Sequence, residues 1–171
     1  SLFEAGIMHT YWQSAIAFAT GVAPGPMGSA HPLDAPYQAF EASDAWLVVG
    51  AANQQNWLRM LLAIERPEMN DDARFADNAA RVVNLDALVD VLAPIFRTRT
   101  RTEWLDRMEA AGVPAAPVMD VAEMHADPHA RSRGMVASID HPTLGAIGTL
   151  GCPIRLSATP AELGHAAPSL G

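Results

Sequence analysis

The segment from Ala110 to Gly134 constrains the fold more than any other part of the chain; it reads AAGVPAAPVMDVAEMHADPHARSRG. Gly112 can end a helix, because glycine reaches the left-handed conformation without a Cβ penalty. Pro114 and Pro117 cannot lie inside a helix, since each lacks an N–H donor and restricts the residue before it. The segment therefore predicts a helix end, a short strand over 113–118 and a second helix.

Capping signals mark the start of the helix on each side of that strand. Thr100 precedes Glu103 by three residues, so each side chain can bind a free backbone N–H group of the other residue. Asp120 and Glu123 repeat this spacing. We expect Pro128 to stop the second helix after two turns.

The rest of the chain predicts an α+β order of elements. Apolar residues recur at helical spacing over 2–19, and Gly21 closes that helix. Two alternating segments joined by a polar turn predict a β-hairpin. The expected elements outside the segment above are a helix over 2–19, strands over 37–41 and 46–50, a helix from the cap Asn53 to Pro67, helices over 77–83 and 85–96, and strands over 135–139 and 148–156. Four parts follow from this order: a connecting helix over 1–20, a loop over 21–36, a small α+β domain over 37–134, and strands with a tail over 135–171.

Composition narrows the kind of protein. With 171 residues, half of them apolar, the chain can bury a core, and no stretch approaches the roughly 20 apolar residues that span a bilayer. The net charge of −8 argues against nucleic acid or an anionic membrane as a partner. The sequence has no lysine, which excludes a Walker phosphate loop and a Schiff-base lysine. A lone Cys152 allows no internal disulfide and favours a reducing, cytoplasmic location.

The N-terminus has no basic region ahead of an apolar core, so we expect no signal peptide. It does not begin with methionine either. We interpret this as a piece of something longer or a start altered by cloning. A complete chain that works as a non-catalytic binding or assembly module is the alternative.

Short motifs along almost the whole chain are similar to those of class III coenzyme A transferases. In order they are HPLDAPYQAF, SDAWLVVGAANQQNW, DDARFADNAARVVN, EWLDRMEAAGVPAAPV, HADPHARSRGM, HPTLGAIGTLGCPIRLSATP and APSLG. That family includes formyl-CoA and carnitine CoA-transferases, with alpha-methylacyl-CoA racemase as a close relative. The resemblance covers the later half of such an enzyme, and it implies that a Rossmann-like region with the catalytic aspartate precedes Ser1.

The resemblance also implies a reaction. A carboxylate attacks the donor thioester, CoA leaves and returns, and the resulting aspartyl-CoA passes its CoA to an acceptor acid. Acyl-CoA and a free carboxylic acid are then the substrates, with no resident cofactor and no metal. No catalytic residue is expected in this chain, and the whole enzyme is expected to be a homodimer.

The junction between the second strand of the hairpin and the next helix is the candidate binding site. It comprises Gly50, Ala51, Ala52, Asn53 and Gln55, and backbone N–H groups at a helix start favour an anion there. An equally open interpretation is that Asn53 only caps the helix. His31 and Tyr37 flank the preceding loop and are further candidates for contact with substrate, although a loop histidine before proline is more often plain surface.

Two departures from the family bear on the reaction. Racemases of this group carry a glutamate near the position of Asn53, and an amide cannot act as a base, which favours the transferase over the racemase. The loop GVAPGPMGSAHP lacks the glycine run of formyl-CoA transferase, so that enzyme's substrate is not carried over.

Several other residues have a structural interpretation beside a functional one. His125 and His129 could hold a metal on a continuous helix, but Pro128 interrupts it. No G-x-S-x-G motif presents a serine nucleophile. The remaining expectations are a core position for Cys152, Trp57 and Trp104, a turn position for His141, and solvated helix faces, rather than a CoA phosphate, for Arg74, Arg81 and Arg133.

Overall fold

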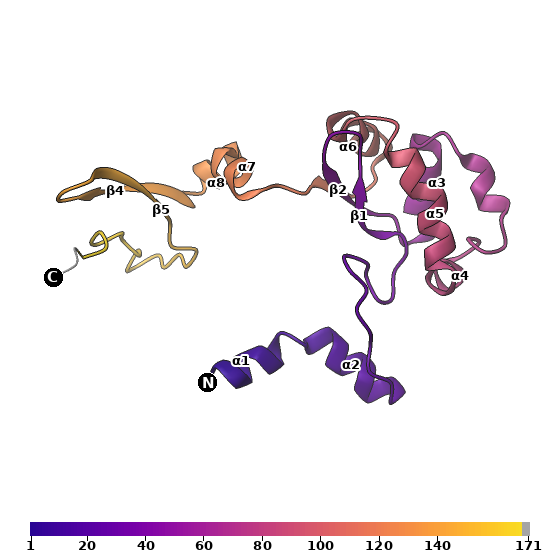
Figure 1. Ribbon diagram of the computed structural model, residues 1–171, viewed down its shortest axis with the longest axis horizontal. Helices are drawn as coiled ribbons and strands as arrows, with labels where there is room; N and C mark the ends of the chain where they lie inside the picture. The colour runs from indigo at the N-terminus through magenta and orange to yellow at the C-terminus, as the bar shows by residue number, and fades with distance from the viewer. Residues whose placement is uncertain (169–171) are drawn as a thin grey trace. The chain divides into compact units, whose positions relative to one another are not determined.

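The computed structural model describes residues 1–168, whose contacts form two compact units, one over Ser1–Pro117 and one from Val118 onward (Figure 1). The α+β class expected from the sequence is confirmed, since each unit combines helices with a small antiparallel sheet. Within residues 1–168, no helix is both long and apolar enough to span a membrane. The last three residues of the APSLG motif lie outside the described residues.

Two helices, α1 (Leu2–Met8) and α2 (Tyr11–Thr20), replace the single helix predicted over 2–19. The break follows from Thr10, whose backbone N–H and hydroxyl both donate to the carbonyl oxygen of Ile7, at 3.0 and 2.7 Å. The Ile7 carbonyl oxygen therefore accepts from residue i+3, as in a 3-10 turn, and not from residue i+4 as in an α-helix. Gly21 ends α2 in the left-handed conformation with φ of 71°, as predicted.

A three-stranded antiparallel sheet organises the first unit. It has the order β1 (Tyr37–Glu41), β2 (Trp46–Gly50) and β3 (Ala115–Pro117). The hairpin of β1 and β2 has the predicted bounds, with Tyr37 opposite Gly50. β3 is shorter than the predicted 113–118, because the N–H of Val113 still donates to Met108 in the last turn of the preceding helix, at 2.8 Å.

Five helical segments complete this unit: α3 (Gln54–Ala63), the 3-10 helix η1 (Pro67–Asp71), α4 (Asn78–Val83), α5 (Leu85–Phe96) and α6 (Arg101–Ala111). Asn53 caps α3, Asp77 caps α4, and Thr100 with Glu103 forms the predicted capping box of α6. Asn84 precedes α5 without a side-chain cap. Its amide donates instead to the carbonyl oxygens of Arg74 and Ala80.

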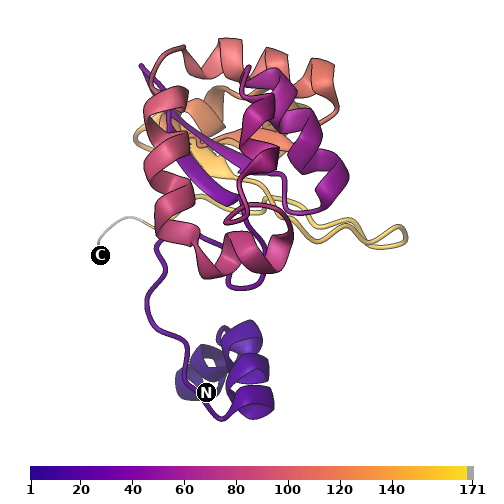
Figure 2. The ribbon, with the colours of Figure 1, turned by 90° about the vertical axis from the view of Figure 1, so that its right-hand side faces the viewer.

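The core lies on one face of the sheet. Phe40, Leu47 and Val49 alternate toward the helices and are almost fully buried. Phe40 stacks on Phe96 with ring centroids 4.6 Å apart. Trp57 and Trp104 belong to this core, as predicted. Figure 2 looks onto the helical layer, with β1 and β2 behind it.

The opposite face of the sheet is open. Tyr37 and Trp46 alternate onto it and remain 46% and 47% exposed. Every β-strand presents its successive side chains to opposite faces, so one register buries Phe40 and Leu47 and exposes these two aromatic residues.

The second unit contains α7 (Val121–Ala126), α8 (Pro128–Ser132), β4 (Val136–His141) and β5 (Gly145–Leu150). Asp120 and Glu123 form the predicted capping box of α7. Pro128 follows the end of α7 and also occupies the first turn of α8, a start that the sequence analysis did not predict. The predicted core position of Cys152 is wrong, because this residue is exposed.

The hairpin of β4 and β5 differs from the prediction in its bounds. Strands were expected over 135–139 and 148–156, but the turn is tighter and begins with His141 still paired in β4. The Nδ1 atom of His141 accepts from the N–H groups of Thr143 and Leu144, at 3.2 and 3.3 Å. Gly145 completes the turn with φ of 71°. The predicted turn position of His141 is therefore wrong, because its ring organises the turn from the strand.

α3 ends at a residue that is not glycine but adopts the left-handed conformation. Glu65 has φ of 61°, while the N–H of Arg66 reaches back to the carbonyl oxygen of Leu61 at 2.8 Å, a common helix-ending motif. A hydrogen bond from Arg107, with the charges of Arg107 and Arg99, lowers the pKa of the Glu65 carboxyl. The exposed ion pair thus sits on a strained backbone position.

Replacing Glu65 separates the two contributions. Glu65→Gln removes the ion pair and keeps the strain, whereas Glu65→Gly removes both, because glycine adopts this conformation freely. We expect Glu65→Gly to melt roughly 5 °C above Glu65→Gln by differential scanning calorimetry. Equal melting temperatures for the two variants would show that residue 65 carries no backbone strain.

Candidate functional site

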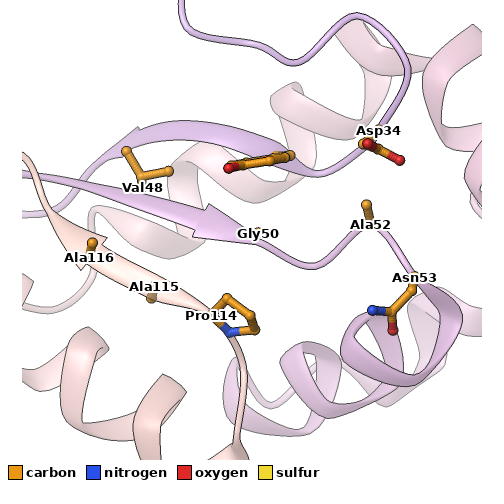
Figure 3. A pocket seen from close by; sticks show the side chains of 9 residues that line it. Asp34, Val48, Gly50, Ala52, Asn53, Pro114, Ala115 and Ala116 are labelled. Atoms are coloured by element: carbon orange, nitrogen blue, oxygen red, sulfur yellow. The ribbon is translucent and has the colours of Figure 1, made fainter.

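An open pocket lies on the exposed face of the three-stranded sheet, where β1 and β2 meet the start of α3 (Figure 3). Its volume is about 530 Å³. Nine residues line it: Asp34, Tyr37, Val48, Gly50, Ala52, Asn53, Pro114, Ala115 and Ala116. All of them belong to the first unit.

The pocket has a polar end and an apolar end. Figure 3 shows Asp34 and Asn53 at one end with Ala52 between them, and Val48 and Ala116 at the other. Between the two ends, Gly50 has no side chain, so its backbone itself lines the pocket. A Cβ there would meet Tyr37 Cδ2 at 3.6 Å, an ordinary contact, so the glycine adds open volume to the pocket instead of relieving a clash.

The structure brings four of the seven predicted binding residues into this lining: Tyr37, Gly50, Ala52 and Asn53. Ala51 is fully buried behind it, and Gln55 is exposed in the first turn of α3. His31 stacks on Tyr37 with ring centroids 5.3 Å apart, one layer away from the pocket. Their roles in binding stay predictions.

The backbone donors of the junction are fewer than the sequence suggested. The N–H of Gly50 donates to Pro114 and that of Ala51 to Pro36, both at 2.8 Å. At the start of α3, the N–H of Asn56 is taken by Asn53. Among the described residues this leaves the N–H groups of Ala52 and Asn53, and those of Gln54 and Gln55, which have no acceptor within the helix.

Asn53 both caps α3 and faces the pocket. Its Oδ1 accepts the N–H of Asn56 at 2.8 Å. That bond assigns the other amide atom as Nδ2, and Figure 3 shows it directed across the pocket toward Pro114. The cap is confirmed, and the same amide keeps a donor for the pocket, so the binding role of Asn53 stays a prediction.

Asp34 is a residue that the sequence analysis missed. It carries the one carboxylate among the nine described lining residues, and its Oδ2 lies 3.2 Å from Nδ1 of His31. The available signal was its place in HPLDAPYQAF, between His31 and Tyr37, two residues already singled out.

Arg81 lies directly behind the pocket. The sequence analysis expected a solvated helix face, and that expectation is wrong, since the side chain is completely buried. The guanidinium lies 4.7 Å from the ring centroid of Trp57. It donates four hydrogen bonds, to the carbonyl oxygens of Ala35 (2.7 Å), Ala52 (2.7 Å) and Phe75 (3.0 Å) and to Oε1 of Gln54 (3.2 Å).

The positive charge of Arg81 is stabilised mainly by the dipoles of backbone carbonyl groups. Burial lowers the pKa of its guanidinium, and the nearby charge of Asp77 partly opposes that change. Arginine nevertheless stays protonated, so the carbonyl oxygens replace its hydration. Arg74 and Arg133 are exposed as predicted, and Arg74 pairs with Asp72 at 2.6 Å.

No metal-binding group was found in the described residues, where three or more His, Cys, Asp or Glu side chains do not gather. His125 lies in α7 and His129 in α8, so the i, i+4 spacing does not fall on one continuous helix.

Comparison with known proteins shows consistent matches. The model of CoA-transferase family III matches residues 1–171. The chain is 33% identical to human succinyl-CoA:glutarate CoA-transferase over 84% of its own length and 33% of that enzyme's. It is 34% identical to acetyl-CoA:oxalate CoA-transferase of Acetobacter aceti, over 81% and 34% of the two lengths. A CAIB/BAIF family protein from Brucella suis shares 34% identity and the fold, with a TM-score of 0.79 over 94% of this chain and 41% of that one.

The α+β fold agrees with these matches. The chain belongs to CoA-transferase family III. It spans about one third of the length of the curated relatives that it matches.

Loss of Arg81 should cost far more stability than loss of Arg74. Arg81→Met leaves three carbonyl oxygens without their donor, those of Ala35 and Phe75 buried and that of Ala52 partly buried, and we expect a loss of about 3 kcal/mol in the free energy of unfolding. Arg74→Met is the matched control, because Arg74 also lies over an aromatic ring, Phe75 at 5.0 Å, but is exposed. Urea unfolding of both variants measures the difference. Similar losses would contradict the central role of Arg81.

Proposed function

We propose that the chain is the substrate-covering part of an enzyme that moves CoA between an acyl-CoA thioester and a carboxylic acid. The observation that carries this proposal is the pocket at the start of α3, in a chain of CoA-transferase family III. The relatives' names each pair an acyl-CoA with an acid, such as glutarate or oxalate. They support a small carboxylic acid as the acceptor.

The nucleophile is proposed to be an aspartate outside this chain, which forms an aspartyl-CoA intermediate. Asn53 cannot titrate, and Asp34, the one carboxylate among the described lining residues, lies 3.2 Å from Nδ1 of His31 and is assigned to that pair. The chain spans about one third of the relatives' length, which supports a nucleophile in another part of the enzyme. We therefore expect no turnover from residues 1–171 alone.

The pocket's part in the reaction would be to stabilise charge. Attack on a thioester carbonyl turns its oxygen into an oxyanion, which needs fixed N–H donors. The Asn53 Nδ2 and the N–H groups of Gln54 and Gln55 are such donors, at the positive end of the α3 dipole. Val48 and Ala116 form an apolar end suited to the acyl chain.

We also propose a homodimeric enzyme in the cytoplasm. The single Cys152, which allows no internal disulfide, is compatible with a reducing compartment. The two-subunit assembly is an expectation from the family resemblance, and size-exclusion chromatography with light scattering on the intact enzyme tests it.

The reaction can be tested with the intact enzyme in deuterated water, supplied with mixed acyl-CoA thioesters and free acids. Mass spectrometry should find new acyl-CoA pairings without deuterium at the α-carbon. Unchanged thioesters carrying α-deuterium would instead identify a racemase, and neither change would favour a non-catalytic module. Turnover by residues 1–171 alone would overturn the assignment of the nucleophile.

Exchanging Asn53 tests the proposed donor separately from the helix cap. Asn53→Ser and Asn53→Asp both keep a capping oxygen, so the melting temperature should hold. Both lose the Nδ2 donor, and Asp adds a negative charge where an oxyanion would form. We expect kcat/KM to fall roughly 10²-fold in Asn53→Asp and less in Asn53→Ser. Wild-type kcat/KM in Asn53→Asp would mean that Asn53 only caps α3.

A further inference from the structure

Besides the segment of Pro114–Ala116, two backbone walls from different parts of the chain bound the pocket. One wall, here called the loop wall, is Leu33–Tyr37, and the other, the junction wall, is Gly50–Asn53. They meet at the strand pair of Tyr37 and Gly50 and at a hydrogen bond from the N–H of Ala51 to the carbonyl oxygen of Pro36, at 2.8 Å. Beyond this edge of the sheet, side chains of α4 bond to both walls.

Asn78, in the first turn of α4, forms hydrogen bonds to the loop wall on both sides of Asp34. Its Oδ1 accepts the N–H of Ala35 at 3.0 Å, and its Nδ2 donates to the carbonyl oxygen of Leu33 at 2.8 Å. Both atoms of one planar amide are thus used, so the backbone that carries Asp34 is held at two points.

Arg81 lies one turn further along α4 and connects the two walls. Its Nε donates to the carbonyl oxygen of Ala35 and its Nη2 to that of Ala52, each at 2.7 Å. Because the guanidinium is planar and rigid, the spacing of its nitrogens determines the spacing of those two carbonyl groups. The Arg81 side chain is completely buried, so water competes little for its bond to Ala35.

We propose that Asn78 and Arg81 form a clamp that sets the separation of the two pocket walls, and with it the affinity for the acyl or carboxylate group. Both are positioning residues, since neither lines the pocket. The clamp holds Asp34 on one wall and Asn53 on the other, the two polar groups at one end of the pocket. The identity of the ligand rests on the proposed function, whereas the clamp geometry does not.

Asn84 offers a matched control for Asn78. Asn84 follows α4, as Asn78 begins it, and its amide likewise makes two hydrogen bonds to the backbone. Its Nδ2 donates to the carbonyl oxygens of Ala80 at 2.8 Å and Arg74 at 3.3 Å. Neither partner belongs to a pocket wall. Asn84→Ala should therefore destabilise the fold without moving the walls.

The first experiment follows amide hydrogen exchange by NMR in residues 1–171, with Asn78→Ala, Arg81→Lys and Asn84→Ala. Exchange at Ala51 reports the bond between the walls. We expect it to accelerate roughly tenfold in Asn78→Ala and Arg81→Lys, beyond any change in the α5 core amides, and to follow those amides in Asn84→Ala. Ala51 tracking the core in all three variants would overturn the clamp. Should Arg81→Lys fail to fold, Asn78→Ala carries the test.

The second experiment measures kinetics of the intact enzyme with the same variants. We expect the KM for the acceptor acid to rise roughly tenfold in Asn78→Ala, with kcat changed much less, and both constants to hold in Asn84→Ala. A fall in kcat alone, or equal effects in Asn78→Ala and Asn84→Ala, would contradict a positioning role. A wild-type enzyme that transfers no CoA would refute the proposed function. The clamp would still be tested by amide exchange at Ala51, which does not depend on catalysis.

Discussion

The buried guanidinium of Arg81 is the interaction on which the rest of the first unit depends. It replaces water with the carbonyl oxygens of Ala35, Ala52 and Phe75, three groups that lie far apart along the chain. α4 has only six residues, and so short a helix has little stability of its own. The unfavourable burial of a charge is offset only when all three segments are in place, so these segments should order together.

The one-sided core explains where the pocket lies. All large apolar side chains of β1 and β2 on the covered face pack against α3, α5 and α6, so the other face of the sheet is free to line an open pocket. Chemistry on a thioester intermediate requires shelter from water, which an open face does not supply by itself. In the proposed enzyme, the region with the nucleophile would cover this face and complete the site.

Local signals in the sequence predicted local structure well. The cap Asn53 and the capping boxes of α6 and α7 were predicted, because each depends on residues within four positions of one another. The hairpin bounds were predicted as well, because both strands and their turn follow one another directly in the sequence. The break at Thr10 was missed because a hydroxyl bonding to Ile7 leaves the apolar periodicity unchanged. Cys152 was misassigned because an apolar stretch alone does not say whether anything packs on it.

The sequence alone determined the α+β class, the order of most elements and the family, since periodicity, capping and short motifs are properties of neighbouring residues. Only the tertiary structure decided that Arg81 is buried, that Asp34 lines the pocket, and that the N–H groups of Gly50 and Ala51 are already bonded to distant carbonyls. Each of these depends on segments tens of residues apart meeting at one point. No local sequence pattern predicts which distant carbonyl oxygen will accept a hydrogen bond from a buried cation or a free N–H group.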